Sequence, residues 1–249
     1  SNTTGGQSPM SHIHRLRNLD DYTVHCARDA AAIAADKQFA ARLIPADNAA
    51  TFTVRGYSVT AEREVDFHVG REHAPPGEVN WRETVNCPVT LFNNRMRAAI
   101  EVFNLEAEAY PDSAIYLTEM VTPMFAYFRS RFSNTVGSEY YGSDLPLGLL
   151  PDGRRNEDLT KLTLADASFD ALLSFDVLEH VPDYMTAFSE CHRVLKPGGC
   201  LIWTVPFVPM HTPNIIRAVV EPCGSIKHLM PPEYHGDPVK QDNKCLCFT

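Results

Sequence analysis

Three polar residues, Asp176, Glu179 and His180, stand directly after a hydrophobic segment and combine two carboxylates with an imidazole. A carboxylate accepts hydrogen bonds or balances a cation, and the ordinary pKa of histidine lies near neutral pH, so His180 is a candidate general base. The alternative is a structural role, in which the ring of His180 hydrogen-bonds the loop and the start of the following helix. The residue types alone leave both roles open.

The surrounding segment, residues 169–207, predicts the elements that position these side chains. It begins with an apolar strand, FDALLSF, and continues through the charged residues into an amphipathic helix. A Pro-Gly-Gly turn then leads to a second apolar strand. This order predicts a βαβ unit of a parallel sheet. Ligands of open parallel sheets bind beyond the carboxyl ends of the strands, where the three polar residues would lie.

Acidic residues also follow other predicted elements. Glu119 follows AIYLT, the candidate first strand; Glu139 lies in GSEYYG at the tip of the candidate second strand; Asp158 lies in the loop NEDLTKL. A carboxylate has two acceptor oxygens and can accept from both hydroxyls of a ribose, and Glu139 stands about 20 residues beyond Glu119, as in dinucleotide-type folds. The alternatives are a helix cap for Glu119 and surface turns for the other two.

Composition limits the class of protein. A chain of 249 residues, 44% of them hydrophobic, can bury an α/β core and one small further module. The net charge of −9 and the lack of a basic run argue against a nucleic-acid surface. No apolar stretch approaches the roughly 18 residues of a membrane helix. Seven cysteines without a disulfide framework indicate the reducing cytoplasm.

The chain is expected to divide into three parts. Residues 1–17 are polar and predict a disordered leader rather than a signal peptide. Residues 18–98 predict an N-terminal helix, over 18–43, followed by a small β module with alternating segments between 51 and 69. Residues 99–249 predict an α/β domain, a Rossmann-like sheet with helices on both faces.

The last part of the chain predicts a mixture of elements. Residues 215–222 indicate a short helix, residues 228–239 an irregular loop stiffened by prolines, and residues 243–249 a strand. The loop carries a His/Glu/His/Asp set, but its spacing matches no standard metal pattern.

Three motifs carry a resemblance to a known family: VLEHVPD at 177–183, a helix ending in E-x-x-RVLKPGG at 190–199, and LIWTVPF at 201–207. Together they resemble the second half of a class I S-adenosylmethionine-dependent methyltransferase, and more narrowly the small-molecule type 11 branch, most clearly over 112–207. The cofactor-binding residues that the resemblance implies are Glu119, Thr122, Glu139, Tyr140, Asp158, Leu159, Phe175, Asp176 and Val177. The implied substrate residues are His228, Tyr234 and His235.

The chain departs from the family pattern in three places. No glycine follows Glu119 in LTEMVTPMF, where the family presents a Gly-rich turn to the cofactor. In the N-terminal module, Cys87 matches one ligand of a small zinc site, but Thr90 stands at the next ligand position. Because zinc needs four ligands, we predict that the chain binds no metal. The family's usual final strand is also expected to be missing from the sheet.

Basic and aromatic residues in this module suggest how it joins the sheet domain. Trp81, Arg82, Asn94, Arg95 and Arg97 are expected to tie the two together. Arg95 and Arg97 could instead reach an anionic substrate.

These observations lead to three functional hypotheses. The first is transfer of a methyl group from S-adenosyl-L-methionine to an oxygen, nitrogen or carbon of a small-molecule acceptor, with no nucleic acid or membrane as partner. The second is an inactive methyltransferase-like protein that serves in binding or assembly. The third, an NAD-type Rossmann oxidoreductase, lacks the GxGxxG motif. A homodimer would cover the exposed edge of the sheet.

Overall fold

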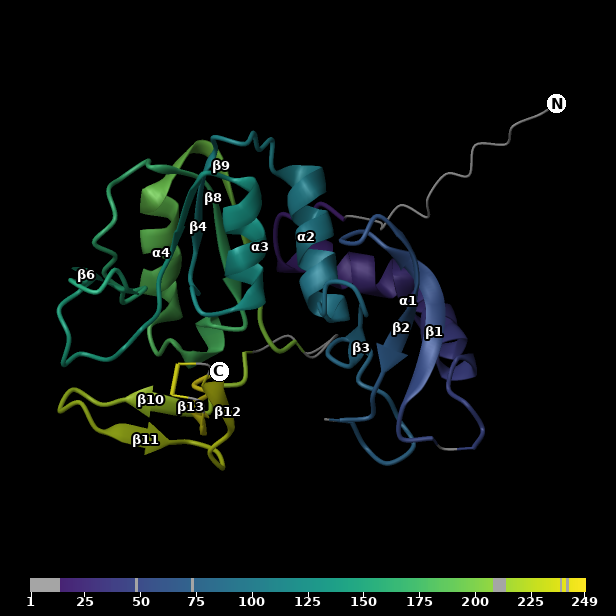
Figure 1. Ribbon diagram of the computed structural model, residues 1–249. Coiled ribbons are helices and arrows are strands. Elements are labelled where there is room, and N and C mark those ends of the chain that lie inside the picture. Colours follow the sequence, from purple (N-terminus) through teal and green to yellow (C-terminus); the bar gives the residue numbers. More distant parts are fainter. Residues whose placement is uncertain (1–13, 48, 73, 208–213, 238, 241) are drawn as a thin grey trace. The chain divides into compact units, whose positions relative to one another are not determined.

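The computed structural model describes residues 14–47, 49–72, 74–207, 214–237, 239–240 and 242–249 (Figure 1). The chain divides into two compact units, residues 1–49 and 50–249. Most of the predicted leader, residues 1–13, lies outside the described residues. The first unit contains helix α1, Leu19–Arg42, which confirms the predicted N-terminal helix. Its cap is Asn18, whose side chain accepts the Asp21 amide at 2.9 Å.

The second unit begins with the small β module expected from the alternating sequence. Strands β1, Phe52–Ser58, and β2, Arg63–Val69, pair antiparallel, and β3, Val85–Asn86, pairs with β2. One face of these strands is buried, because every second residue of β2 from Val65 onward is apolar. Helix α2, Asn94–Glu106, follows and is capped by the Asn93 side chain.

Four parallel strands form the central sheet, in the order β5-β4-β8-β9. Their bounds are β4 Ala114–Leu117, β5 Asn134–Gly137, β8 Phe169–Phe175 and β9 Leu195–Thr204. Helix α3, Pro123–Arg131, connects β4 to β5, and α4, Tyr184–Val194, connects β8 to β9. The predicted βαβ unit is therefore confirmed, and all carboxyl ends of these strands lie at the same edge.

Helices cover both faces of the sheet, as predicted (Figure 1). Successive residues of β4 alternate between two cores: Ile115 and Leu117 pack with α2 and α3, whereas Tyr116 packs with α4. All three side chains are fully buried. Burial of each such side chain stabilises the fold by about 1.5–3 kcal/mol, so the alternation fixes which face of the strand each helix covers.

Short paired strands make up the rest of the second unit. They are β6 Gly148–Leu149 with β7 Arg155–Asn156, β10 Ala218–Val220 with β11 Ile226–His228, and β12 Tyr234–Asp237 with β13 Asp242–Leu246. A single 3-10 turn, η1, spans Leu178–His180 after β8. Among the described residues, no helix is both long and apolar enough to cross a membrane.

The C-terminal hairpins correct two predictions. The expected helix at 215–222 is wrong, because Ala218–Val220 forms β10 and a turn with Gly224 at φ 86° folds the chain back into β11. The expected irregular loop at 228–239 is also wrong, since it contains β12. Consecutive β-branched residues in AVV favour a strand over a helix. The predicted strand near the end of the chain is confirmed as β13.

Two edges bound the central sheet in the described part of the chain, β5 on one side and β9 on the other. No further strand pairs with β9 among these residues, as expected for a sheet without the usual final strand.

Gly137, the last residue of β5, determines how closely β5 approaches α3 and the segment after β4. A Cβ atom at this position would lie 2.5 Å from the Phe125 ring on α3 and 2.7 Å from the carbonyl oxygen of Glu119. The missing side chain therefore lets α3 and the segment after β4 lie directly against β5.

We expect Gly137→Ala to destabilise the full chain by about 1–3 kcal/mol in urea unfolding, because the new methyl group overlaps a backbone oxygen that cannot rotate away. Gly56→Ala is the matched control, since its nearest contact is the Phe67 ring at 3.2 Å. An equal decrease in the free energy of unfolding for Gly137→Ala and Gly56→Ala would contradict this account.

Candidate functional site

Three carboxylates gather at the carboxyl ends of the central strands. Glu119 follows β4, Glu139 follows β5 and Asp176 follows β8. Burial raises the pKa of Glu119 to about 7; the Thr122 hydroxyl opposes the shift, while the charges of Glu139 and Asp176 add to it and that of Arg95 reduces it. Glu119 Oε1 is buried and has no hydrogen-bond partner among the described residues. The structure thus brings these three predicted residues together.

Glu139 fixes the segment that follows β4. Its Oε1 accepts the backbone amides of Met120 and Val121, at 2.7 and 3.1 Å. The residue is only 8% exposed, and burial raises its pKa despite these two bonds. A carboxylate therefore holds the turn that follows β4, in which the sequence has no glycine.

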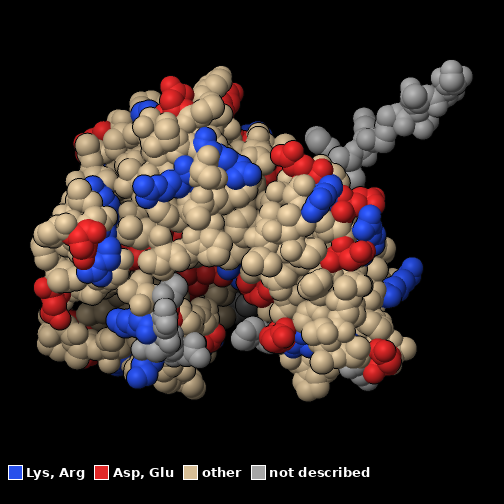
Figure 2. Space-filling model, in the orientation of Figure 1, with Lys and Arg blue, Asp and Glu red and all other residues tan. Residues whose placement is uncertain are grey.

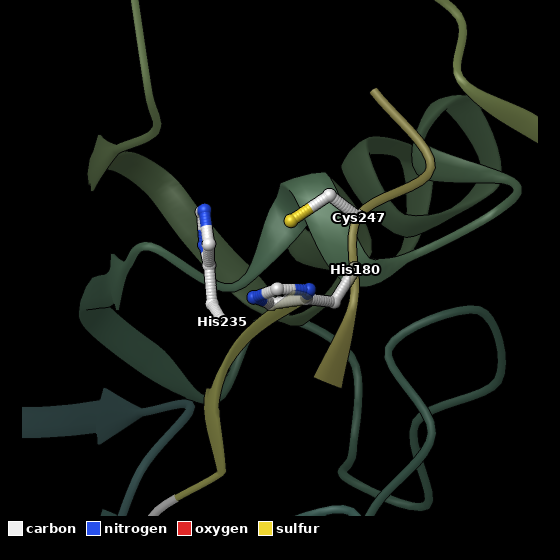
Figure 3. A group of neighbouring side chains, drawn as sticks. All are labelled: His180, His235 and Cys247. Atoms are coloured by element: carbon white, nitrogen blue, oxygen red, sulfur yellow. The ribbon is translucent and has the colours of Figure 1, made fainter. Parts of the chain in front are cut away.

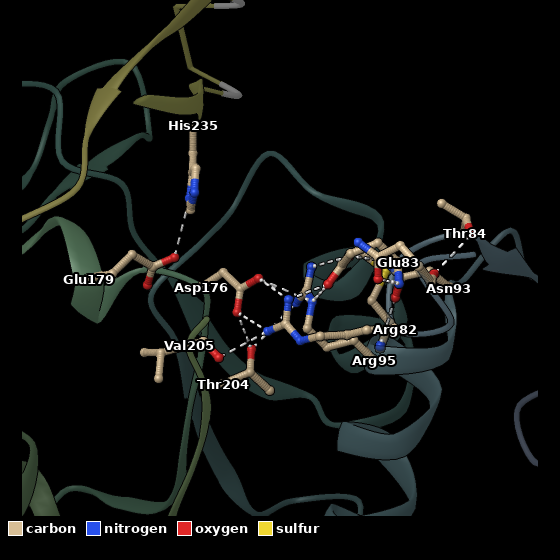
Figure 4. A network of polar contacts seen from close by, with 12 residues as sticks. Arg82, Glu83, Thr84, Asn93, Arg95, Asp176, Glu179, Thr204, Val205 and His235 are labelled. Atoms are coloured by element: carbon tan, nitrogen blue, oxygen red, sulfur yellow. Dashed lines mark hydrogen bonds and ion pairs between the residues drawn. The ribbon is translucent and has the colours of Figure 1, made fainter. Parts of the chain in front are cut away.

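Asp176 is the most strongly paired of the three acids (Figure 4). Arg82 donates to both of its oxygens, at 3.0 and 2.7 Å, and the Arg95 Nε lies 3.2 Å from Oδ2. The Thr204 hydroxyl donates to Oδ1 at 2.8 Å. Burial alone would raise the pKa of Asp176, but these hydrogen bonds and charges outweigh burial and hold it below its usual value.

The backbone of Asp176 adopts φ 53°, in the left-handed region that non-glycine residues occupy at a cost of roughly 1–2 kcal/mol. Its amide donates to the carbonyl of Thr204 at 2.8 Å. The side-chain bonds to two arginines offset this strain and aim the carboxylate away from the strand axis.

The same network joins the β module to the sheet. Arg82 also donates to the carbonyl of Val205 at 3.2 Å, and Glu83 accepts from Arg95 at 2.8 Å and from Asn93 at 2.7 Å (Figure 4). The predicted connecting role is confirmed for Arg82 and Arg95.

Arg97 behaves differently from these two arginines. It donates to the carbonyls of Val85 and Phe92, at 2.8 and 2.7 Å, and its contacts therefore lie within the module. The expectation that it ties the module to the sheet is wrong for this residue, because its guanidinium is buried against β3 and the Phe67 ring.

A groove of about 480 Å³ opens beside the network. Its lining combines the two arginines with apolar side chains of α2 and β9: Trp81, Arg82, Asn94, Arg95, Ala98, Ala99, Val102, Ile202, Trp203 and Thr204. On the face drawn in Figure 2, basic and acidic side chains are both widely spread.

Several predicted cofactor residues have structural partners of their own. Thr122 caps α3 by accepting the Phe125 amide at 3.3 Å. Phe175 packs in the core beneath α2 and α3, whereas Leu159 and Val177 pack in the core beneath α4. These positions lie close in sequence to the acids but turn inward to the cores.

The two remaining cofactor candidates differ in exposure. Tyr140, next to Glu139, is 57% exposed. Asp158 accepts the amide and hydroxyl of Thr160, at 2.9 and 2.7 Å, and lies 3.8 Å from Lys161. These contacts all belong to the Asp158 turn itself, so they do not link it to the other acids.

The predicted base and substrate residues separate into two groups. His180 and His235 lie together, with ring centroids 5.3 Å apart (Figure 3). His180 Nδ1 lies 2.8 Å from the Leu246 carbonyl, and burial lowers the pKa of its imidazole. His228 and Tyr234 are exposed on the hairpins.

Sequence patterns did not indicate two residues of these sites, Glu83 and Cys247. Glu83 completes the arginine network, Glu179 lies 3.6 Å from His235, and the Cys247 thiol lies beside both histidines. Burial raises the pKa of Glu179 to about 7 and that of Cys247 to about 12. The polar cluster after β8 had marked Glu179, but no spacing in the chain connects residue 247 to residue 180.

The parallel sheet with helices on both faces is the Rossmann-like architecture expected from the resemblance to class I methyltransferases. Residues 108–203 of this chain match the family model described as "Methyltransferase domain". A demethylmenaquinone methyltransferase of Streptomyces avermitilis is 36% identical over 92 residues, 30% of this chain and 39% of that protein.

Two further similarities cover 19% and 51% of this chain. A ubiquinone biosynthesis O-methyltransferase of Cereibacter sphaeroides is 42% identical over 48 residues, 19% of each protein. The solved structure of DesVI from Streptomyces venezuelae aligns with a TM-score of 0.36 and 18% identity, over 51% of this chain and 58% of that one. This chain thus spans well under half the length of the curated relatives named here.

The raised pKa of Glu119 predicts how stability depends on pH. Folded Glu119, with a pKa of about 7, keeps its proton at pH values where the unfolded side chain, near 4.5, has lost it. Folding therefore takes up a proton between these values, and this group makes the chain less stable as pH rises through them, by at most about 3 kcal/mol.

Glu119→Gln removes this titration and should be close to wild type at pH 4.5 but more stable at pH 8, by urea unfolding. The exposed Glu108→Gln variant is the control and should show no such trend. A stability difference for Glu119→Gln that stays constant with pH would rule out a neutral buried carboxyl.

Proposed function

We propose that this protein binds S-adenosyl-L-methionine and transfers its methyl group to a small-molecule acceptor. The observation that carries the proposal is the pairing of Glu119 and Glu139 at adjacent strand ends, inside a methyltransferase domain. A nucleoside ligand with a positively charged amino acid part needs an acceptor for hydroxyl groups and an acceptor for a cation, and this pair supplies both.

The carboxylate oxygens that remain available as hydrogen-bond acceptors on the two acids fit this ligand. Oε1 of Glu119 is buried without a partner, so an ammonium group placed there would supply the missing donor and favour the ionised carboxylate. Oε1 of Glu139 is engaged by two backbone amides, and Oε2 is left to accept from ribose hydroxyls. Tyr140 offers an exposed ring beside it for the adenine. We assign Asp158 and Leu159 to the adenine edge by the resemblance alone.

When bound, the cofactor supplies a methyl group on a sulfonium, whose departure leaves a neutral thioether. The protein then has to align the acceptor and exclude water. Asp176 is held by two arginines and stays ionised, so it positions neighbouring groups rather than exchanging protons. His180 remains a candidate base for an oxygen or nitrogen acceptor, and His228, Tyr234 and His235 remain candidate acceptor contacts.

The class of acceptor is a small molecule that enters from the arginine-lined groove. That groove presents the ring of Trp81 and apolar side chains of α2 beside Arg82 and Arg95, whose charges are balanced by Asp176 and Glu83, which suits a planar acceptor. The two relatives named above are, by their names, methyltransferases for demethylmenaquinone and in ubiquinone biosynthesis. An inactive binding protein on the same scaffold is the alternative, because no glycine follows Glu119.

Isothermal titration of the full chain with S-adenosylmethionine and S-adenosylhomocysteine tests the proposal, and we expect micromolar binding of both. Glu139→Gln keeps an oxygen for the Met120 and Val121 amides but replaces the other acceptor by a donor, so affinity should fall at least tenfold with the free energy of unfolding nearly unchanged.

Asp144→Asn, at an exposed carboxylate in the following connection, is the matched control and should bind like the wild type. The absence of binding by the wild-type chain would overturn the cofactor assignment and favour the inactive alternative. Equal affinity of the Gln variant and the wild type would reject the role of Glu139.

A homodimer in the cytoplasm completes the proposal. Strand β9 forms an edge of the described sheet, with Trp203 43% exposed on it, and a second copy would cover this edge. All seven cysteines are free thiols in the structure, in keeping with a reducing compartment. Light scattering should give twice the chain mass, and Trp203→Lys should give the mass of one chain; a monomeric wild type would refute the dimer.

A further inference from the structure

A second group of chemically active side chains lies beyond the acids of the proposed cofactor site. His180, His235 and Cys247 come from three separate elements: η1, β12 and the residues that follow β13 (Figure 3). Each offers one ligand atom, and these atoms all lie within 4.8 Å of one another. Imidazole nitrogen and thiol sulfur are ligand types that zinc prefers.

The orientation of His180 suits a metal ligand. Its Nδ1 lies 2.8 Å from the Leu246 carbonyl oxygen, which can only accept, so Nδ1 carries the proton. Nε2 then presents a lone pair toward His235 and Cys247. Histidines that bind metals commonly donate their other ring nitrogen to a carbonyl or carboxylate in this way.

Glu179 gives an independent indication of a missing ligand. The residue is 1% exposed, and neither of its carboxylate oxygens has a hydrogen-bond partner among the described residues. Oε1 lies 3.6 Å from His235 Nδ1 and 3.8 Å from His180 Nε2, so it points into the group. An unpartnered buried carboxylate is costly, and a bound cation would remove that cost.

We propose that Glu179, His180, His235 and Cys247 bind one zinc ion, in place of the sequence-based prediction that the chain binds no metal. With the ion bound, His180 and His235 serve as ligands and are no longer available as base or acceptor contact. The set provides four ligands of O, N, N and S type, the number that tetrahedral zinc requires. A carboxylate and a thiolate also balance the two positive charges of the ion. Binding converts the Cys247 thiol to a thiolate, and its proton passes to water.

The distances require a modest contraction of the group. Tetrahedral bonds of about 2.0–2.3 Å place ligand atoms roughly 3.5 Å apart, compared with up to 4.8 Å between His180, His235 and Cys247 here. Glu179 is not part of the group within 4.8 Å, so rotations of the two imidazole rings and of the Cys247 and Glu179 side chains have to bring the four ligand atoms together.

The ion would link the β12–β13 hairpin to the turn η1, which follows strand β8 of the central sheet. The chain already makes backbone contacts there, since the amide of Phe248 donates to the Glu179 carbonyl at 2.7 Å. Asp176 lies three residues before Glu179, so the hairpin would be held close to the proposed cofactor site. A structural zinc in this position would differ from the N-terminal zinc site considered from the sequence, for which only Cys87 matches a ligand.

Another group of possible ligands, His14, His25 and Asp29 in the first unit, has no unpartnered buried carboxylate. Asp29 is already paired with Arg28 at 2.7 Å, and the group contains exposed side chains. It therefore serves as the specificity control.

Elemental analysis of the full chain purified with zinc should find one zinc per chain. Cys247→Ser and His235→Ala should each lose most of it, whereas Cys223→Ser, at an exposed cysteine, and His25→Ala should retain it. X-ray absorption should show one sulfur at about 2.3 Å together with nitrogen and oxygen ligands at about 2.0–2.2 Å. Less than a tenth of an equivalent in the wild type, or equal zinc in all variants, would overturn the proposal.

Cobalt substitution tests the thiolate ligand in the wild-type chain itself, so the result does not depend on whether a ligand variant folds. Cobalt added to the metal-free wild type should produce a thiolate charge-transfer band, and Cys223→Ser should produce the same band. Its absence in the wild type, with far-ultraviolet circular dichroism showing a folded chain, would reject Cys247 as a ligand. Neither measurement involves S-adenosylmethionine, so this proposal and the proposed function can fail separately.

Discussion

The concentration of negative charge at one edge of the sheet is the constraint on which the site depends. Parallel strands bring Glu119, Glu139 and Asp176 together, and three ionised carboxylates in a buried space repel one another strongly. The chain resolves this repulsion in three ways. Asp176 is paired with Arg82 and Arg95, Glu139 accepts two backbone amides, and Glu119 has a pKa of about 7 and so holds its proton in mildly acidic conditions.

The arginine network makes the small β module part of the site rather than an attachment to it. Arg82 lies 94 residues before Asp176 in the chain, and both oxygens of the aspartate are bound by it. Loss of Asp176 would leave Arg82 and the largely buried Arg95 with less compensation, and charges left without partners cost more than a surface ion pair contributes. The geometry at the end of β8 is therefore set by residues of the turn before β3 and of α2.

The sequence predicts the central elements because their signals are local. The apolar run before Asp176 and the helix before Arg193 together require a βαβ unit, and Glu119 and Glu139 follow from the ends of their strands. The C-terminal hairpins were not predicted. The three-residue segment AVV is too short to distinguish the 3.6-residue repeat of a helix from the two-residue repeat of a strand, and the pairing of β10 depends on a turn at Gly224. The proximity of Cys247 to His180 depends on tertiary packing alone, so no local pattern could indicate it.

The order β5-β4-β8-β9 also shapes the synthesis of the chain on the ribosome. Strand β4 emerges early and finds β5 soon afterwards, but its other neighbour, β8, is translated only after the two-stranded β6–β7 connection. In the interval one edge of β4 is open, and Ile115, Tyr116 and Leu117, which are fully inaccessible in the finished fold, lack their covering layers. A nascent chain in this state exposes an unpaired strand edge and apolar side chains, which makes it prone to aggregation until β8 has been translated.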